Sequence, residues 1–218
     1  MKIFLLAHSG GNVWTYKRMF QSIEKHSFIP IEVPGNVSRL GDELPNSLEE
    51  YIDYAYRVIL DNSMSNEQIG LFGHSFGGYL LYELAQRLGS RVKRVIVSGS
   101  TPFHMFQMPP EASDYSSLYG YPVKNCEEIV KLFDPIIRHK IELIDRYKDK
   151  FVGQQIQQLS VPVVFVWATD DKMTSYIHEW EKYYDAETSR YIEVKGGHFY
   201  WMNDTESREI LMNVMEEI

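Results

Sequence analysis

Cysteine is almost absent from this chain, since Cys126 is the only one in 218 residues. A single thiol cannot close an internal disulfide, which fits a reducing compartment, so we expect a cytoplasmic protein. Metal-binding patterns are missing as well, because no Cys-x-x-Cys occurs and His178-Glu179 is not part of an H-E-x-x-H motif. The dinucleotide fingerprint G-x-G-x-x-G is also missing. We therefore expect no metal and no cofactor.

Long apolar runs are missing too. The longest, such as Val161 to Ala168, are far shorter than the roughly 20 residues that cross a bilayer as a helix. At the N-terminus, Met1 to His8 combines a lysine with a short apolar run. This run is shorter than the core of a secretory signal and no small-residue cleavage site follows it, so we interpret it as a first strand. The sequence predicts no membrane segment.

Basic residues are in the minority. The chain has 22 Lys and Arg against 30 Asp and Glu, which gives a net charge of −8. Nucleic acids and anionic membranes are bound through basic surfaces, so we expect neither as a partner. With 44% apolar and 24% charged residues, the composition is that of a globular protein, and the length suits one α/β domain spanning residues 1–218.

Apolar strand patterns alternate with helical ones along the chain. Pro30 interrupts the second strand, which suggests an edge position or irregular pairing. Ser47-Leu48-Glu49-Glu50 has the form of a capping box at a helix start. This alternation predicts a mainly parallel sheet with helices on both faces and a ligand crevice at the carboxyl ends of the strands. We expect strands at 2–6, 28–33, 69–72, 94–98, 161–168 and 191–194, and helices at 14–25, 47–60, 76–88, 175–184 and from 205 onward.

The strand rhythm disappears between Thr101 and about Gln158. Such an insertion between core strands is where a hydrolase carries its lid. We expect two short helices in it, the second beginning at Asp134-Pro135, an N-cap followed by proline in the first turn. An apolar stripe follows at Ile137, Ile141 and Ile144. Aromatic residues of the insertion suit a channel for an acyl chain; they are Phe103, Phe106, Tyr115, Tyr119 and Tyr121.

The stretch from Leu71 to Leu80 changes its apolar period at Ser75. A buried strand pattern precedes the serine, and leucines spaced by four residues follow it. Gly73-x-Ser75-x-Gly77 is the pattern of the nucleophile elbow of α/β-hydrolases, where small flanking residues leave room for a strained turn. We therefore predict that Ser75 is a nucleophile in an α/β-hydrolase fold with a helical lid insertion at about 101–158.

Two other interpretations of this glycine-rich stretch are weaker. A flexible loop would have neither the strand before it nor the helix after it. A phosphate-binding loop would need Lys-Ser or Lys-Thr where Tyr79-Leu80 stand.

A serine nucleophile needs a base, and the chain has seven histidines. Only His198 follows a late strand on a Gly-Gly loop, so we predict that it is the base. Asp171 or Asp170 supplies the acid that orients it, and we favour Asp171 because it lies three residues past the small residue that ends the strand. The order serine, aspartate, histidine is that of α/β-hydrolases.

The oxyanion of an acyl-transfer intermediate needs backbone donors. We expect one to be the amide of Phe76, directly after the nucleophile. The other should come from the glycine-containing loop after the first strand, through the amide of Ser9 or His8.

Together these residues resemble the type II thioesterases of nonribosomal peptide and polyketide synthesis. The likeness covers nearly the whole chain, although the first loop reads Ala-His-Ser-Gly-Gly where the family more often has Pro-x-Ala-Gly-Gly. It is based on Ser9 to Gly11, Val33 to Gly35, Gly73 to Gly78, Ser98 to Pro102, the helix after Asp134-Pro135, Asp170 to Lys172 followed by Trp180, and Gly196 to Phe199.

This resemblance implies a thioesterase that removes aberrant or stalled acyl groups from the phosphopantetheine arms of carrier proteins. It implies that Ser75, Asp171 and His198 form the triad, with Phe76 and the Ser9 loop at the oxyanion. We expect the protein to be a monomer. Carrier proteins are usually acidic, so docking on this acidic chain needs a local basic patch, for which we name Arg138, His139 and Lys140, or Lys17 and Arg18. A small-molecule esterase or lipase and a non-catalytic binding scaffold are the alternatives.

Overall fold

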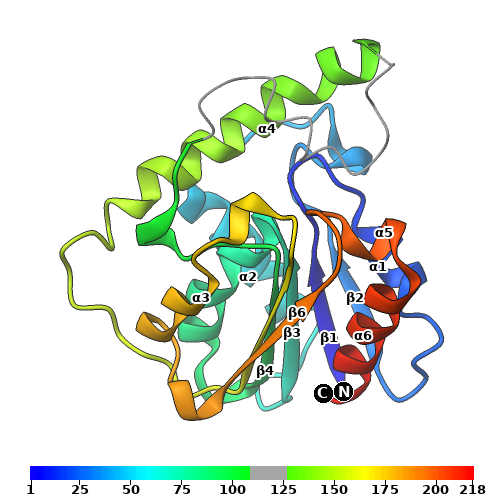
Figure 1. Cartoon of the computed structure of the whole chain (residues 1–218), viewed down its shortest axis with the longest axis vertical. Helices are drawn as coiled ribbons and strands as arrows, with labels where there is room; N and C mark the ends of the chain where they lie inside the picture. The colour runs from blue at the N-terminus through cyan, green and yellow to red at the C-terminus, as the bar shows by residue number, and fades with distance from the viewer. Residues whose placement is uncertain (109–126) are drawn as a thin grey trace.

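Six parallel strands form one sheet in the computed structural model of the protein, which describes residues 1–108 and 127–218. The sheet order is β2-β1-β3-β4-β5-β6, so β2, with Pro30, lies at an edge as predicted. Figure 1 shows the strands with their carboxyl ends on the same side of the molecule. The strands are β1 (Lys2–Leu6), β2 (Ser27–Ile31), β3 (Ile69–His74), β4 (Val92–Ser98), β5 (Val163–Ala168) and β6 (Ser189–Val194).

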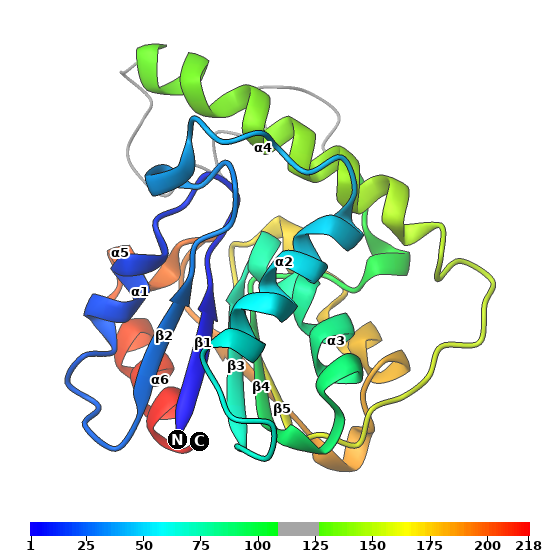
Figure 2. The ribbon, with the colours of Figure 1, turned by 180° about the vertical axis from the view of Figure 1, so that it is seen from behind.

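Helices cover both faces of the sheet because successive strand residues point to opposite sides. In β1, Phe4 and Leu6 belong to one buried cluster, whereas Ile3 and Leu5 belong to the other. The first cluster packs against α2 (Leu48–Asp61) and α3 (Phe76–Leu88). The second packs against α1 (Val13–Met19), α5 (Tyr200–Asn203) and α6 (Thr205–Glu216), which lie on the opposite side in Figures 1 and 2. The predicted two-sided α/β fold is confirmed.

Several element ends differ from the prediction for local reasons. Helix α1 ends at Met19 rather than Lys25, because the N–H of Phe20 bonds back to the carbonyls of Tyr16 and Arg18 and the chain then turns. At the start of α2, Ser47 accepts from the N–H of Glu50 as expected, but the Glu50 carboxylate accepts from Asn46 instead of Ser47. The predicted helix at 175–184 is a 3-10 helix at Ile177–Lys182.

From residue 127 onward, the insertion forms one long helix that runs through the predicted start of a second short one. Helix α4 (Glu127–Lys148) passes through Pro135, and Asp134 bonds to Arg138 one turn later instead of beginning a new helix. The apolar stripe of Ile137, Ile141 and Ile144 is buried and gives the helix its packing face, which outweighs the missing proline N–H. The described residues do not include Tyr115, Tyr119 and Tyr121, which we predicted for the acyl channel, or Cys126.

Helix α4 crosses above the carboxyl ends of the strands in both ribbon views (Figures 1 and 2). Aromatic rings attach its C-terminal end to the body, since Phe103 stacks on Phe151 at 4.8 Å and contacts Tyr147 at 5.3 Å. Within the described ranges, no helix has the length and apolar character needed to traverse a bilayer.

Two glycines allow β3, β1 and α3 to approach one another around Ser75. A Cβ on Gly73 would lie within 3.0 Å of the carbonyl group of Gly77, and a Cβ on Gly77 would lie equally close to the carbonyl group of Leu6 in β1. Both obstacles are backbone atoms, which cannot rotate away. The small residues of the elbow are therefore required by contact with neighbouring main chain.

We expect Gly77→Ala to lower the free energy of unfolding by about 1–3 kcal/mol, because the methyl group forces α3 away from β1. Urea unfolding measures this loss. Gly41→Ala is the matched control, since nothing lies within 4 Å of a Cβ at that position. Equal stabilities of the two variants would contradict the argument from contact.

Candidate active site

Ser75 occupies the sharp turn between β3 and α3. Its φ of 53° is the only positive value among the described non-glycine residues. Such a conformation is costly for a residue with a side chain and persists only where the surroundings enforce it. Here the Ser75 N–H donates to Ser98 at 2.8 Å, and the Ser75 carbonyl accepts from Ser100 Oγ at 2.8 Å. The turn predicted from Gly73-x-Ser75-x-Gly77 is thus fixed by the end of the neighbouring strand β4.

His198 and Asp171 form a buried pair at the same end of the sheet. His198 Nδ1 lies 2.8 Å from Asp171 Oδ2, and both side chains are 3% exposed. The other carboxylate oxygen of Asp171 accepts from the N–H of Met173 at 3.0 Å. Asp170 is exposed, and its N–H donates to the carbonyl of Gly196. Of the two aspartates that the sequence left open, Asp171 is the one in contact with the histidine.

The pairing with Asp171 sets the tautomer of His198. A carboxylate accepts, so Nδ1 holds the proton and Nε2 presents its lone pair. Nε2 is buried and has no hydrogen-bond partner within the described part of the chain. The imidazole lies 4.8 Å from the ring of His74, the residue directly before Ser75. These contacts bring the predicted serine, histidine and aspartate to one end of the sheet.

Two further histidines surround this pair and stay uncharged. Burial lowers the pKa of His74 well below its usual value, with the charge of His198 adding to the effect. Burial, followed by the charges of His198 and Lys140, lowers the pKa of His8 to about 3. His74 Nδ1 is 2.8 Å from Ser98 Oγ, which in turn bonds to Tyr200. Neutral neighbours do not oppose a positive charge on His198 electrostatically.

The loop after β1 lies beside Ser75. Ser9 is buried, and its Oγ has no hydrogen-bond partner among the described residues. His8 supports this loop. Its Nδ1 bonds to Tyr16 at 2.9 Å, and its ring occupies the space that a Cβ on Gly11 would need. Phe76 is the first residue of α3, whose leading N–H groups have no acceptor within the helix. The two predicted oxyanion positions, Phe76 and Ser9, line one cavity with Ser75.

This cavity is small and is covered by α4. Its volume of about 20 Å³ is roughly the space of one water molecule. The polar lining residues are Ser9, Ser75 and Lys140, and the remaining ones are Phe76, Tyr79, Phe106, Ile141, Ile144 and Met173.

Lys140 has a different place from the one we predicted. We expected it on a basic docking face, but its side chain is fully buried and Nζ bonds to Asn36 Oδ1 at 2.7 Å. Burial lowers the pKa of Lys140 from 10.5 to about 7, although the charge of Glu32 raises it. A signal was available in the sequence, because Lys140 lies three residues after Ile137 and four before Ile144, on the apolar face of the helix.

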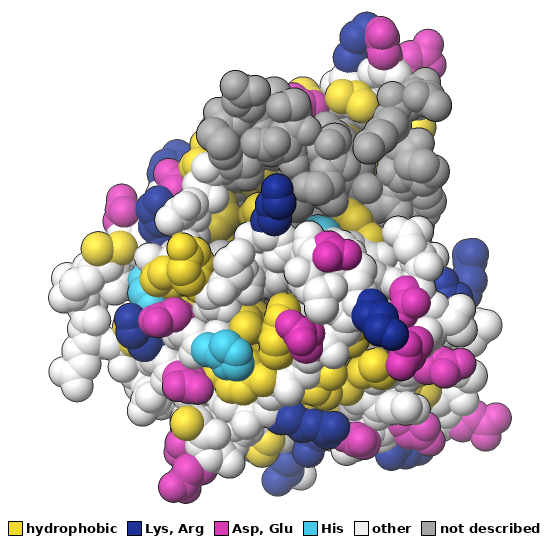
Figure 3. Space-filling model, in the orientation of Figure 1, with side chains coloured by type: hydrophobic (Ala, Val, Ile, Leu, Met, Phe, Trp, Pro, Cys, Tyr) yellow, Lys and Arg dark blue, Asp and Glu magenta, His cyan; other side chains and the backbone are white. Residues whose placement is uncertain are grey.

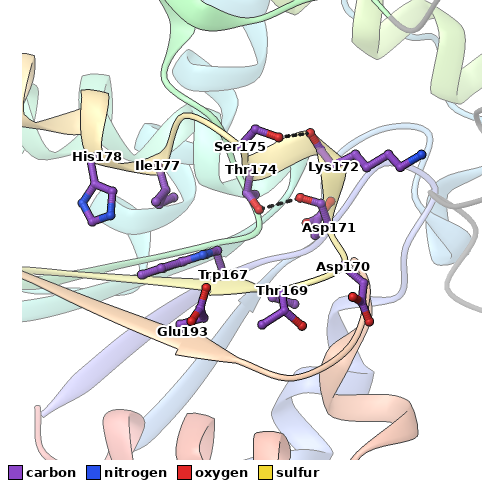
Figure 4. A pocket seen from close by; sticks show the side chains of 11 residues that line it. Trp167, Thr169, Asp170, Asp171, Lys172, Thr174, Ser175, Ile177, His178 and Glu193 are labelled. Carbon is purple, nitrogen blue, oxygen red and sulfur yellow. Dashed lines mark hydrogen bonds between the residues drawn. The ribbon is translucent and has the colours of Figure 1, made fainter.

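A larger groove of about 520 Å³ lies beside Asp171 (Figure 4). Asp170 and Asp171 line one end of it, and Trp167, His178 and Glu193 line the rest. Neither Ser75 nor His198 contributes to this groove. Size alone therefore does not locate the site. In the ranges 1–108 and 127–218, no group of three or more His, Cys, Asp or Glu side chains is arranged to hold a metal ion.

The fold and the sharp turn at Ser75 are those of an α/β-hydrolase. In this fold, a serine on such a turn is the nucleophile of a serine hydrolase. Residues 1–118 match the family model of the thioesterase domain, which is more than half of the chain. The protein therefore belongs to the thioesterase domain family and is an enzyme of the thioester-hydrolysing kind.

Similar proteins of known structure include thioesterases of natural-product pathways. The RedJ thioesterase from the prodiginine biosynthetic pathway in Streptomyces coelicolor has a TM-score of 0.80 at 20% identity, over 99% of this chain and 84% of that one. ClbQ from the colibactin NRPS/PKS pathway has a TM-score of 0.78 at 21% identity, over 99% of this chain and 97% of that one. These likenesses establish the shared fold.

A relative detected by sequence is the linear gramicidin dehydrogenase LgrE of Brevibacillus parabrevis. It is 20% identical over 94% of this chain and 83% of its own length. Its name denotes a different reaction, and at this identity the likeness transfers no activity.

We expect Asp171→Asn to lower kcat for a short acyl thioester by roughly 10³–10⁴-fold, because the amide no longer fixes the His198 tautomer. Steady-state thiol release measures this effect. Asp170→Asn is the control and should leave kcat near the wild-type value, since Asp170 faces solvent. Equal losses in the two variants would contradict the assignment of Asp171.

Lys140 should give the stability of the protein a distinct pH dependence. In the unfolded chain its pKa is about 10.4, so between about pH 7 and 10 the unfolded state binds more protons and the free energy of unfolding rises with pH. Below that window both states are protonated and the contribution is constant. We expect this rise, on the order of a few kcal/mol, to be absent in Lys140→Met when urea unfolding is followed across the window.

The matched control is Lys131→Met on the same helix, where the side chain is 77% exposed. It should keep the pH dependence of the wild type. If Lys140→Met kept it too, Lys140 would titrate normally in the folded state.

Proposed function

We propose that this protein hydrolyses acyl groups from the phosphopantetheine arms of carrier proteins, using Ser75, His198 and Asp171 as a catalytic triad. The observation that supports this most directly is the buried 2.8 Å contact between His198 Nδ1 and Asp171 Oδ2, with the His198 ring 4.8 Å from that of His74, the residue before the elbow serine. Membership of the thioesterase family supports the thioester bond as the one that is cleaved.

The reaction begins when Ser75 Oγ attacks the thioester carbonyl carbon. His198 Nε2 takes the hydroxyl proton, and Asp171 stabilises the resulting imidazolium through Nδ1. The carbonyl oxygen becomes an oxyanion that accepts hydrogen bonds from the amides of Phe76 and of the Ser9 loop. Collapse of this intermediate breaks the carbon–sulfur bond, and the proton on Nε2 passes to the departing thiolate.

Hydrolysis of the acyl-serine completes the cycle. His198 Nε2 removes a proton from water, which attacks the ester carbonyl, and then returns a proton to Ser75 Oγ as the acid product leaves. The low pKa values of His8 and His74 support this step, because neither of these neighbouring rings adds a positive charge beside the imidazolium.

We propose that the insertion at about 101–158 is a lid within one domain formed by residues 1–218. The cavity above Ser75 holds about 20 Å³, which is too little for an acyl chain. Helix α4 supplies Lys140, Ile141 and Ile144 to its wall, so this helix must shift to admit substrate. We also propose that the protein is a monomer and that it works in a reducing cytoplasm.

The docking face for the carrier is better supported on α1 than on α4. Lys140 is buried, Arg138 is bonded to Asp134, and His139 Nε2 is 2.7 Å from the carbonyl of Pro45. Lys17 lies over the ring of Trp14, whose side chain is 47% exposed, and Arg18 is exposed beside them. Elsewhere charges of both signs are interspersed on the face drawn in Figure 3. We therefore keep Lys17 and Arg18 as the proposed basic contact.

The test compares kcat/KM for one acyl group on a carrier protein, on coenzyme A and as a nitrophenyl ester. We expect the carrier-bound thioester to be hydrolysed most efficiently, because the carrier adds contacts that the smaller substrates lack. Ser75→Ala should remove hydrolysis of all three and also labelling by a fluorophosphonate.

A paired variant, Lys17→Glu with Arg18→Glu, should lower kcat/KM only for the carrier-bound substrate. A preference for the nitrophenyl ester would identify a small-molecule esterase. A wild-type serine that fluorophosphonates do not label would indicate a binding scaffold.

A further inference from the structure

The inference concerns Lys140 and rests on the proposed thioester hydrolysis. We propose that Lys140 determines specificity, by selecting acyl groups that bear a carboxylate a few bonds away from the thioester carbonyl. The residue lies on α4 and lines the cavity of Ser75, Ser9 and Phe76. No step of the triad chemistry uses it.

Lys140 has unusually few partners for a fully buried lysine. Nζ donates to Asn36 Oδ1 at 2.7 Å and lies 4.8 Å from the ring of Phe76 and 5.2 Å from that of Tyr51. An ammonium has three N–H donors, and the described residues provide one hydrogen-bond acceptor. Ring faces attract a cation but accept no conventional hydrogen bond.

The described residues also provide no counterion in contact with Lys140. The acid whose charge raises the pKa of Lys140 is Glu32, and its two carboxylate oxygens accept from the N–H groups of Val13 and Ser38. Burying a charge without a partner is unfavourable, and this is why the pKa of Lys140 falls to about 7. An anion in the cavity would supply the missing partner.

Two other donors next to Lys140 are also unused. Asn36 Nδ2 and Ser9 Oγ are buried and have no hydrogen-bond partner in the described part of the chain. Asn36 belongs to the same cluster as Lys140 through its Oδ1, and Ser9 lines the cavity. The groups without a partner are thus the ammonium and the Ser9 hydroxyl, whose residues line the cavity, and the amide N–H of Asn36, which contacts the lysine but does not line the cavity. A carboxylate, with two acceptor oxygens, matches this set better than a neutral or cationic group does.

The placement of Lys140 limits the length of such a group. Ser75 and Lys140 line the same cavity, so a carboxylate that meets the lysine must follow closely after the acyl carbonyl. The apolar wall of Tyr79, Ile144 and Met173 suits the methylene groups between them. The substrate class is therefore short dicarboxylic acyl thioesters.

The experiment compares succinyl-pantetheine with butyryl-pantetheine, which have the same chain length and differ in the terminal carboxylate. We expect the wild-type enzyme to have the higher kcat/KM for the succinyl thioester. In Lys140→Met, the succinyl to butyryl ratio of kcat/KM should fall by at least about tenfold, because the carboxylate then enters an apolar cavity unpaired. Lys131→Met, on the exposed face of the same helix, should keep the wild-type ratio.

The ratio separates selection of charge from a purely structural role of Lys140. If the lysine only holds α4 in place, the two thioesters lose efficiency together and the ratio stays within about tenfold of the wild type, which would overturn the proposal. A succinyl to butyryl ratio of kcat/KM below one in the wild-type enzyme would overturn it as well. This measurement does not depend on the folding of any variant. If the wild-type enzyme hydrolyses butyryl-pantetheine but Lys140→Met leaves the ratio unchanged, only the specificity proposal fails and the thioesterase function stands. If the wild-type enzyme hydrolyses neither thioester, both proposals fail.

Discussion

The positive φ of Ser75 is the constraint on which the site depends. A residue with a side chain adopts this conformation only when its neighbours compel it, and here the hydrogen bonds to Ser98 and Ser100 do so. The same turn requires Gly73 and Gly77, because α3 starts against the backbone of its own strand and of β1. Burial of two apolar clusters, one on each face of the sheet, supplies the free energy that maintains the strained turn at Ser75.

The second half of the site is held by a separate part of the chain. Asp171 follows β5 and His198 follows β6, so their contact depends on the parallel pairing that aligns the ends of these strands at Ala168 and Val194. His74 lies between the two halves, bonded to Ser98 on β4 and in ring contact with His198. The buried neutral imidazole thus connects the elbow with the base.

Most of the fold and the residues brought together at the strand ends were predictable, because their signals are local. Gly73-x-Ser75-x-Gly77 specifies a turn by steric need, and the alternation of patterns specifies parallel strands. The insertion was harder. Asp134-Pro135 has the local form of a helix start, but the buried stripe of Ile137, Ile141 and Ile144 continues the helix through it. Lys140 was misplaced because a lysine is normally on the surface, although its spacing from Ile137 and Ile144 puts it on the buried face of the helix.

Helix α4 also touches the loop after β1. Phe133 lies so close to Gly10 that any side chain there would collide with its ring. Gly10 follows Ser9, whose loop we propose as an oxyanion donor. In that proposal, displacement of α4 to admit substrate removes a support from the loop that stabilises negative charge, so the site is complete only after α4 has returned. Closure would then be coupled to chemistry, and water entering the open form would meet an incomplete site.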